Sequence, residues 1–424
     1  MTEIYLIRHG EAEGNVFRRL HGNYDGLLTP RGMRQVKCVE KRFENIHIDA
    51  CYSSDLTRTS LTARSIYVPK GLKLRRDPRF REINCGPWED IPYGQLDQLY
   101  PEEMYRFNYK PTEWNVEGAE NFAVYSQRFY EGVVDAAKEN DGKTIAIFAH
   151  GCVIRSLLMR EFFGEDVSKL PYSDNTGVSK LFYDNGRFTY EFVNDNSHLP
   201  EELSTFALQR WWRETGRRKD VNFWYRPYEP GMELAEGVQM PPVDENGQVL
   251  VAVLHGELVG VVSMAAPEGD CGRVLGMGLK PDMDGRYYGD QLLGCAFSYY
   301  RGLGCKNLAL EPGWYPDDIV ARYEFDPETH TRNIDTGIFN WEQNIKVYGS
   351  MLCPDCVACC KDLDKAGVAY QYLDFSENLK NLKEFLKIRD GNPMFDDLRA
   401  EGKIGIPCIV REDGSITLDW EEYK

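Results

Sequence analysis

The chain has 424 residues, of which 42% are hydrophobic, so it is long enough for two or three domains with a buried core in each. Acidic residues outnumber basic ones by 67 to 50, and the formal net charge of −17 argues against nucleic acids and anionic membranes as partners. No apolar run reaches the roughly 20 residues that a membrane span needs, and the opening sequence lacks the apolar stretch of a signal peptide, so we expect a cytoplasmic protein.

The first 200 residues alternate short strand-like runs with longer helical patterns. We expect strands at 4–7, 50–53 and 144–149, each followed by a helix, at 30–43, 56–67 and 152–163. This alternation predicts a mostly parallel α/β sheet. A hairpin-like pair at 180–183 and 187–193 follows, and the polar stretch 193–200 is expected to be a loop.

Two histidines stand where predicted strands of this sheet end. Arg8-His9-Gly10-Glu11 follows the first strand directly, and His150 ends another strand in Ala149-His150-Gly151. Ligands of open α/β sheets bind beyond the carboxyl ends of the strands, so we expect the two histidines to share one pocket. Arg58 lies in the first turn of a helix, where a guanidinium and the helix N-terminus both favour an anion. The pattern predicts a phosphate site.

These motifs resemble the histidine phosphatase superfamily, also called phosphoglycerate mutase-like, over about the first 200 residues. The matching segments, in chain order, are 8–11 with Asn15, 21–32, 53–58, 81–89 and 149–151. The resemblance implies an α/β sandwich over residues 1–205 that hydrolyses a small phosphorylated metabolite. Asp90 departs from the pattern, since many relatives carry Gly there, and we expect it to reshape its loop.

The resemblance also implies the role of each site residue. His9 would be the nucleophile and form a phosphohistidine that water then hydrolyses, which divides one displacement into two. Glu82 would be the acid and base. Arg8, Arg58 and His150 would contact the non-bridging phosphoryl oxygens. Asn15 and Gly10 would contact the substrate. This mechanism requires no metal or cofactor, because arginines and histidines offset the charge.

A mutase is the alternative within the same family, since a second hydroxyl group can accept the phosphoryl group in place of water. The segment from Glu82 to Ala119 is compact and resembles the small-molecule phosphatase branch more than the glycolytic mutases. The sequence therefore favours a phosphomonoesterase.

Residues 206–341 are expected to form a second, α+β module. Strands predicted at 249–255, 259–265 and 273–279 form a meander, followed by a helix at 289–302 and a strand at 307–311. This order resembles the acetyl-CoA-dependent N-acetyltransferase superfamily. The resemblance places Gly285 and Gly289 at a turn whose N–H groups bind pyrophosphate, but the neighbouring Asp284 would repel it. Two alternatives to acetyl transfer stay open: a scaffold that binds acyl-CoA, and a degenerate module that only joins its neighbours.

Residues 342–424 are expected to form a third module. Cys353-Pro354-Asp355-Cys356 follows a predicted strand at 345–348 and opens a helix, an arrangement in which the helix N-terminus favours a thiolate. With Ile406-Pro407 before another strand, the module resembles glutaredoxins of the thioredoxin fold.

That resemblance implies that Cys353 forms a mixed disulfide with a thiol reductant or disulfide partner, that Cys356 resolves it, and that Pro407 is cis. Thiol-disulfide exchange is thus the main alternative for the function of the chain. A zinc or iron–sulfur site remains open too, with Cys359 and Cys360 as further ligands.

Overall fold

The computed structural model describes residues 1–166, 169–171, 173–208, 221–283, 285–315, 318–336, 345–365, 368, 370–376, 379–411 and 415–423. They form two compact units, Met1–Ala63 with Leu74–Asp335, and Arg64–Lys73 with Thr336–Lys424. The first unit therefore holds most of the first two predicted modules, whereas Arg64–Lys73 of the first module belongs to the second unit. The predicted boundary at 341/342 and the acidic residue Asp284 lie outside the described residues. No helix in the described ranges is long and apolar enough to cross a membrane.

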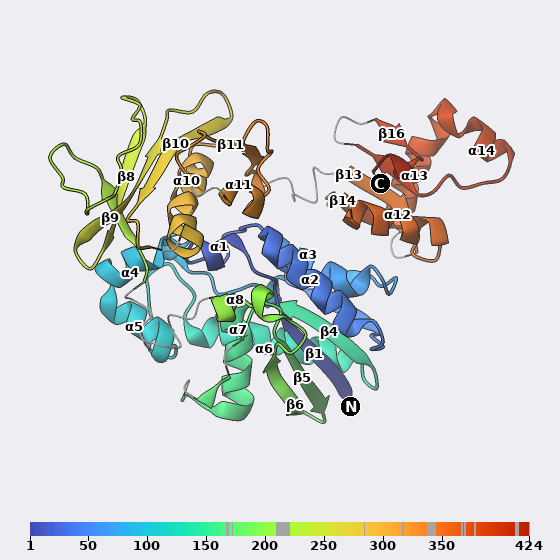
Figure 1. Ribbon diagram of the computed structural model, residues 1–424. Coiled ribbons are helices and arrows are strands. Elements are labelled where there is room, and N and C mark those ends of the chain that lie inside the picture. The colour runs from blue at the N-terminus through green and yellow to red at the C-terminus, as the bar shows by residue number, and fades with distance from the viewer. Residues whose placement is uncertain are drawn as a thin grey trace. The chain divides into compact units, whose positions relative to one another are not determined.

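A six-stranded sheet organises the first part of this unit, in the order β3-β2-β4-β1-β5-β6. Figure 1 labels its strands β4, β1, β5 and β6. Its strands are β1 (Thr2–Arg8), β2 (Ala50–Ser53), β3 (Leu74–Arg76), β4 (Thr144–Ala149), β5 (Val178–Asp184) and β6 (Arg187–Asp195). The first four strands are parallel, and β5 and β6 add an antiparallel edge. The predicted mostly parallel α/β sheet is confirmed, but β6 extends to Asp195, into the stretch expected to be a loop.

Helices connect the strands of this sheet. They are α1 (Glu13–Val16), α2 (Pro30–Phe43), α3 (Thr57–Tyr67), α4 (Tyr93–Leu99), α5 (Pro101–Tyr109), α6 (Phe122–Glu139), α7 (Gly151–Leu158) and, further on, α8 (Thr205–Leu208). Helix α2 begins where the sequence predicts, because the Thr29 side chain accepts a hydrogen bond from the Gly32 amide and Pro30 occupies the first turn. The helix predicted at 152–163 is instead α7 followed by a π-helical turn, Met159–Phe163.

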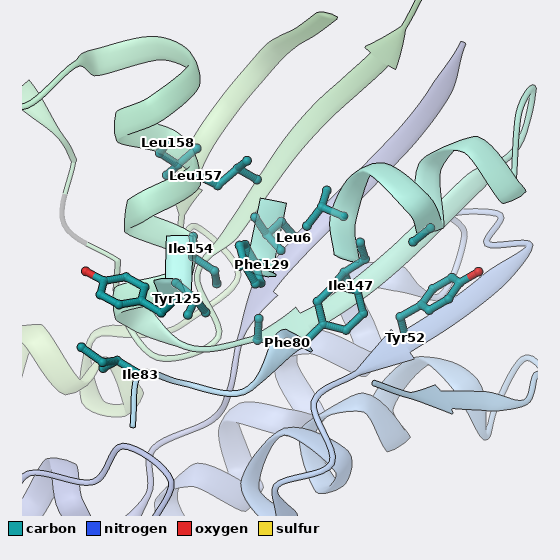
Figure 2. Close-up of a cluster of buried hydrophobic side chains, with 14 of the residues drawn as sticks. Leu6, Tyr52, Phe80, Ile83, Tyr125, Phe129, Ile147, Ile154, Leu157 and Leu158 are labelled. Carbon is teal, nitrogen blue, oxygen red and sulfur yellow. The ribbon is translucent and has the colours of Figure 1, made fainter. Parts of the chain in front are cut away.

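The main core of this part lies between the sheet and its helices. Figure 2 shows Leu6 of β1, Ile147 of β4, Phe129 of α6 and Leu157 of α7 in one buried cluster, and all four side chains are at most 1% exposed. Strand β4 is apolar along almost its whole length because helices cover both faces of a central parallel strand. This packing fixes the ends of β1 and β4, where both histidines lie.

A second six-stranded sheet follows in the same unit, in the order β12-β11-β10-β9-β8-β7. Its strands are β7 (Trp224–Pro227), β8 (Gln248–Leu254), β9 (Glu257–Met264), β10 (Cys271–Leu279), β11 (Asn307–Leu310) and β12 (Thr331–Asn333). The predicted meander is β8-β9-β10, and β10 pairs in parallel with β11. Helix α10 (Asp290–Gly302) precedes β11 and α11 (Ile319–Arg322) follows it.

The C-terminal unit contains a four-stranded sheet in the order β14-β13-β15-β16. Its elements are β13 (Ile345–Gly349), α12 (Pro354–Lys365), β14 (Tyr370–Asp374), α13 (Leu379–Asp390), α14 (Asp396–Ala400), β15 (Cys408–Val410) and β16 (Ile416–Thr417). Strands β13 and β14 are parallel, whereas β15 is antiparallel to β13 and to β16. The Ile406–Pro407 peptide bond is cis, as expected.

Candidate functional site

A cavity of about 400 Å³ lies at the carboxyl end of the first sheet. His9 follows β1 and lines this cavity, and His150 follows β4. The two imidazole rings lie 5.1 Å apart between centroids, so the structure brings together two residues that are 141 positions apart in the chain. Other lining residues are Arg8, Asn15, Arg58, Glu82 and Asn222.

His9 is oriented as a neutral imidazole. Its Nδ1 lies 2.6 Å from the Gly10 carbonyl oxygen, which can only accept, so Nδ1 carries the proton and donates it. Burial, together with the charges of Arg58 and Arg8, lowers the pKa of His9 well below its usual value. The ring therefore keeps an unprotonated Nε2, which is the nucleophile that attack on phosphorus requires.

His150 is buried and neutral as well. Burial and the charge of Arg58 lower the pKa of His150 well below its usual value. Its Nε2 lies 2.8 Å from the Ser54 hydroxyl oxygen, at the end of β2. The buried Nδ1 has no hydrogen-bond partner among the described residues, and His150 lies behind the residues that line the cavity rather than among them.

Arg58 places a buried positive charge at the site. It is 1% exposed, and its Nη1 and Nη2 donate to the carbonyl oxygens of Tyr24 and Gly22 at 2.9 and 2.7 Å. Both acceptors are neutral, so these hydrogen bonds orient the guanidinium without cancelling its charge. The Arg8 guanidinium lies against Gly151, where a Cβ atom would be 3.5 Å from its Cζ. The two arginines make the site cationic within an acidic protein.

Glu82 lies at the start of α7, beside the second histidine. Its carboxylate accepts the amides of Cys152 at 2.9 Å and Val153 at 3.2 Å, and also the amide of Ile83 at 3.0 Å. These three amides fix the position of the Glu82 carboxyl group in the wall of the cavity.

The two predicted substrate contacts have different surroundings. The Asn15 side chain lines the cavity and its Oδ1 accepts the Ala12 amide at 2.9 Å. By contrast, the amide of Gly10 donates to the Thr62 hydroxyl group at 2.9 Å while its carbonyl oxygen holds His9, so both backbone groups have internal partners.

Sequence reasoning missed several residues that shape the site. Ser54 was noted only as part of a motif, although its hydroxyl group holds His150. Asn175 donates to the His9 carbonyl oxygen at 3.1 Å, and Asn222 reaches the cavity from beyond residue 205. Loop residues of this kind carry no periodicity, so only the Ser-Ser-Asp motif before Arg58 could have pointed to one of them.

The predicted pyrophosphate turn forms a π-helical turn, Gly285–Gly289, leading into α10. The first residue of α10 is Asp290, which is 4% exposed and receives a hydrogen bond from Arg322 at 2.5 Å. Burial raises the pKa of Asp290 to about 7, although Arg322 opposes the rise. Because this carboxyl group is buried and paired with Arg322, it leaves no isolated negative charge at the helix start, and acetyl-CoA binding at Gly285 and Gly289 stays a prediction.

The C-terminal cysteines divide by exposure. Cys353 is partly exposed and immediately precedes α12, while Cys356 is fully buried within it. Burial raises the pKa of Cys356 to about 12, so this thiol stays protonated. Cys359 and Cys360 are also buried, and no cluster of three or more metal-ligating side chains occurs in the described ranges.

Comparisons with known proteins match these parts of the chain. The model of the histidine phosphatase superfamily (branch 1) matches residues 4–196, and the model of the acetyltransferase (GNAT) family matches residues 207–313.

Individual relatives cover a little under half of the chain. Phosphoserine phosphatase 1 of Hydrogenobacter thermophilus is 29% identical over 204 residues, which are 47% of this chain and 96% of that protein. A probable phosphoglycerate mutase, GpmB of Yersinia pestis, is 35% identical over 214 residues, covering 47% of this chain and 95% of its own. Among solved structures, YhfR of Bacillus stearothermophilus is 30% identical and covers 47% of this chain and 99% of its own, with a TM-score of 0.45.

Proposed function

Because the chain belongs to the histidine phosphatase superfamily through residues 4–196, we propose that residues 1–205 hydrolyse a small phosphorylated metabolite through a phosphohistidine on His9. The observation that carries the proposal is the neutral imidazole of His9, with its proton on Nδ1 and its Nε2 unprotonated, beside Arg8 and Arg58. An imidazole needs this state to attack phosphorus.

The reaction has two displacements. In the first, the lone pair of His9 Nε2 forms a bond to phosphorus, the ester P–O bond breaks, and the leaving oxygen takes a proton from the Glu82 carboxyl group. In the second, Glu82 takes a proton from water as the water oxygen attacks, and the N–P bond breaks to release phosphate. Arg8, Arg58 and the Nδ1 of His150 donate to the phosphoryl oxygens, where negative charge concentrates.

The relatives support both hydrolysis and transfer, since one is a phosphoserine phosphatase and another a probable phosphoglycerate mutase. We favour hydrolysis, on the compact segment between Glu82 and Ala119. O-phosphoserine and the phosphoglycerates are the substrates that the names of the relatives suggest for a first test.

The test uses the full-length chain. Wild type and His9→Ala are compared in phosphate release from p-nitrophenyl phosphate, O-phosphoserine and 3-phosphoglycerate, and the wild type is trapped with acid-labile phosphate on His9. We expect turnover and trapping in the wild type and neither in the variant. Turnover that survives in His9→Ala contradicts the mechanism, and conversion of one phosphoglycerate into another without phosphate release identifies a mutase.

We also propose that the C-terminal unit is a glutaredoxin-like thiol-disulfide oxidoreductase. The strand order β14-β13-β15-β16 and the partly exposed Cys353 at the start of α12 support this second activity. Cys353 would attack a disulfide of the partner to form a mixed disulfide and release one thiolate. Cys356 would then displace the second thiol and leave an intramolecular disulfide, which a thiol reductant returns to two thiols.

A further inference from the structure

One segment of the phosphatase part is held from two sides. Residues 13–24, which we call the pocket segment, supply Asn15, Arg18 and His21 to the wall of the cavity. On one side, the carbonyl oxygens of Gly22 and Tyr24 orient the Arg58 guanidinium. On the other side, the segment contacts α10 of the GNAT-family domain, next to α1 in Figure 1.

A buried ion pair makes the first of these contacts. The Glu13 carboxylate is 2% exposed and receives two hydrogen bonds from Arg301, at 2.7 and 3.0 Å. Burial acts to raise the pKa of Glu13, but Arg301 outweighs it, so the pKa is lowered and the group is ionised. The Arg301 Nε also donates to the Ile334 carbonyl oxygen at 2.6 Å, which fixes the guanidinium on its own domain. Such a two-point pair sets the position of α1 as well as its distance from α10.

Asp90 makes the second contact. Its backbone adopts a φ of +56°, and its carboxylate accepts hydrogen bonds from Arg19 at 2.6 Å and from His21 at 2.9 Å. The same carboxylate accepts the Ser298 hydroxyl group of α10 at 2.6 Å. Ser298 also accepts a hydrogen bond from Arg19 at 2.8 Å. The residue expected to reshape its loop therefore joins the pocket segment to the second domain.

Apolar packing makes the third contact. Phe17 is 3% exposed, and its ring lies 5.1 Å from that of Phe297 and 5.6 Å from that of Tyr323. A Cβ atom at Gly294 would lie 2.4 Å from the Phe17 Cβ, so only glycine permits this approach. The pocket segment and α10 thus share one core.

We propose that Ser298 and Arg301 are positioning residues of the phosphatase site, acting through the pocket segment on Arg58. The inference rests on the proposed function, and it gives the GNAT-family domain a role that needs no acetyl transfer. Helix α10 binds Glu13 and Asp90 and so fixes the pocket segment. The Gly22 and Tyr24 carbonyl oxygens of that segment orient the Arg58 guanidinium, which would bind the phosphoryl group. Small displacements of such a group lower the rate steeply.

Three variants of the full-length chain test the proposal. Ser298→Ala removes one hydrogen bond to Asp90, and Arg301→Lys keeps the charge but loses the two-point geometry. The double variant Glu13→Gln/Arg301→Met removes both partners of the ion pair, so that neither is left buried without the other. Arg273→Ala is the matched control, because it breaks another Arg–Glu pair of the same domain, at an exposed position.

Two quantities are measured well below the unfolding temperature of each variant, so that a loss of stability alone changes neither. They are kcat/KM with p-nitrophenyl phosphate and the affinity for orthovanadate, a phosphate analogue, by calorimetry. We expect kcat/KM to fall about 10- to 100-fold in the double variant, less in Ser298→Ala and Arg301→Lys, with weaker orthovanadate binding in the same order. Arg273→Ala should match the wild type in both.

The outcomes separate this inference from the proposed function. Folded variants that match the wild type in both quantities overturn the positioning role while leaving the phosphatase intact. A wild type without turnover overturns the proposed function, and orthovanadate affinity then still decides the positioning role. If the double variant does not fold, Ser298→Ala and Arg301→Lys decide the question.

Discussion

Ser54→Ala tests how the second histidine is oriented. The Ser54 hydroxyl group lies 2.8 Å from His150 Nε2 and 2.5 Å from the Thr59 hydroxyl group, in a fully buried position. When the hydroxyl proton points to Nε2, the proton of the neutral ring must be on Nδ1, the nitrogen that would donate to the phosphoryl group. The substitution removes this constraint and leaves a buried nitrogen without a partner.

The expected effect has two parts. An unsatisfied buried polar group costs about 1–3 kcal/mol in the free energy of unfolding. Deleting a whole donor to a developing negative charge lowers kcat by roughly 10²- to 10³-fold. Because Ser54→Ala keeps the imidazole and loses only its orientation, we expect a smaller decrease in kcat, of about 10-fold.

The assay is kcat with p-nitrophenyl phosphate, together with the thermal unfolding midpoint. Ser54→Thr keeps the hydroxyl group and should retain most of the activity. Ser156→Ala is the control, since Ser156 is buried in α7 and donates only to the Val153 carbonyl oxygen. A folded Ser54→Ala variant with the kcat of the wild type would refute the assignment of the His150 proton.

Three further predictions concern pH, thiols and acetyl-CoA. A histidine with the ordinary pKa of about 6.5 is only about one-tenth neutral at pH 5.5. The pKa values of His9 and His150 are lowered, so kcat/KM should fall less than 10-fold between pH 7.5 and 5.5. Protonation of these rings favours the unfolded chain, so urea midpoints should be unaffected by them above pH ~6.5 and fall below it; a midpoint that rises on acidification contradicts their burial as neutral rings. Cys353→Ser should abolish disulfide reduction, whereas Cys356→Ser should accumulate the mixed disulfide in mass spectra; a Cys353→Ser variant that still reduces disulfides removes the second activity. Calorimetry with acetyl-CoA tests the predicted pyrophosphate turn at Gly285 and Gly289, since saturable binding supports it and a flat isotherm contradicts it.

Local sequence signals predicted the elements that carry the site. The bounds of α2, β2 and β4 agree with the sequence prediction, because a Thr-Pro cap and short apolar runs define them without help from distant residues. Strands β7 and β12 were not predicted. Each is a short edge strand, and β7 ends at Pro227, so pairing with a neighbour rather than composition defines them.

The motifs also predicted that His9 and His150 would meet, but not which contacts between domains fix the surrounding segment. His9 and His150 end neighbouring parallel strands, so their meeting follows from the order of the sheet. The contact of Asp90 with Ser298 spans 208 residues and two domains, and no periodicity relates the two positions. The sequence showed only that Asp90 was unusual for its loop.

The core shared by Phe17 and α10 matters for anyone who trims this protein for expression. A cut after residue 205 would remove α10, which covers the Phe17 ring. It would also leave the buried Glu13 carboxylate without Arg301, its counterion. A fragment made that way is expected to aggregate or to lose its affinity for phosphate, even with every family motif intact. Shorter versions for crystallisation or substrate screening should therefore retain α10 together with the residues that pack against it.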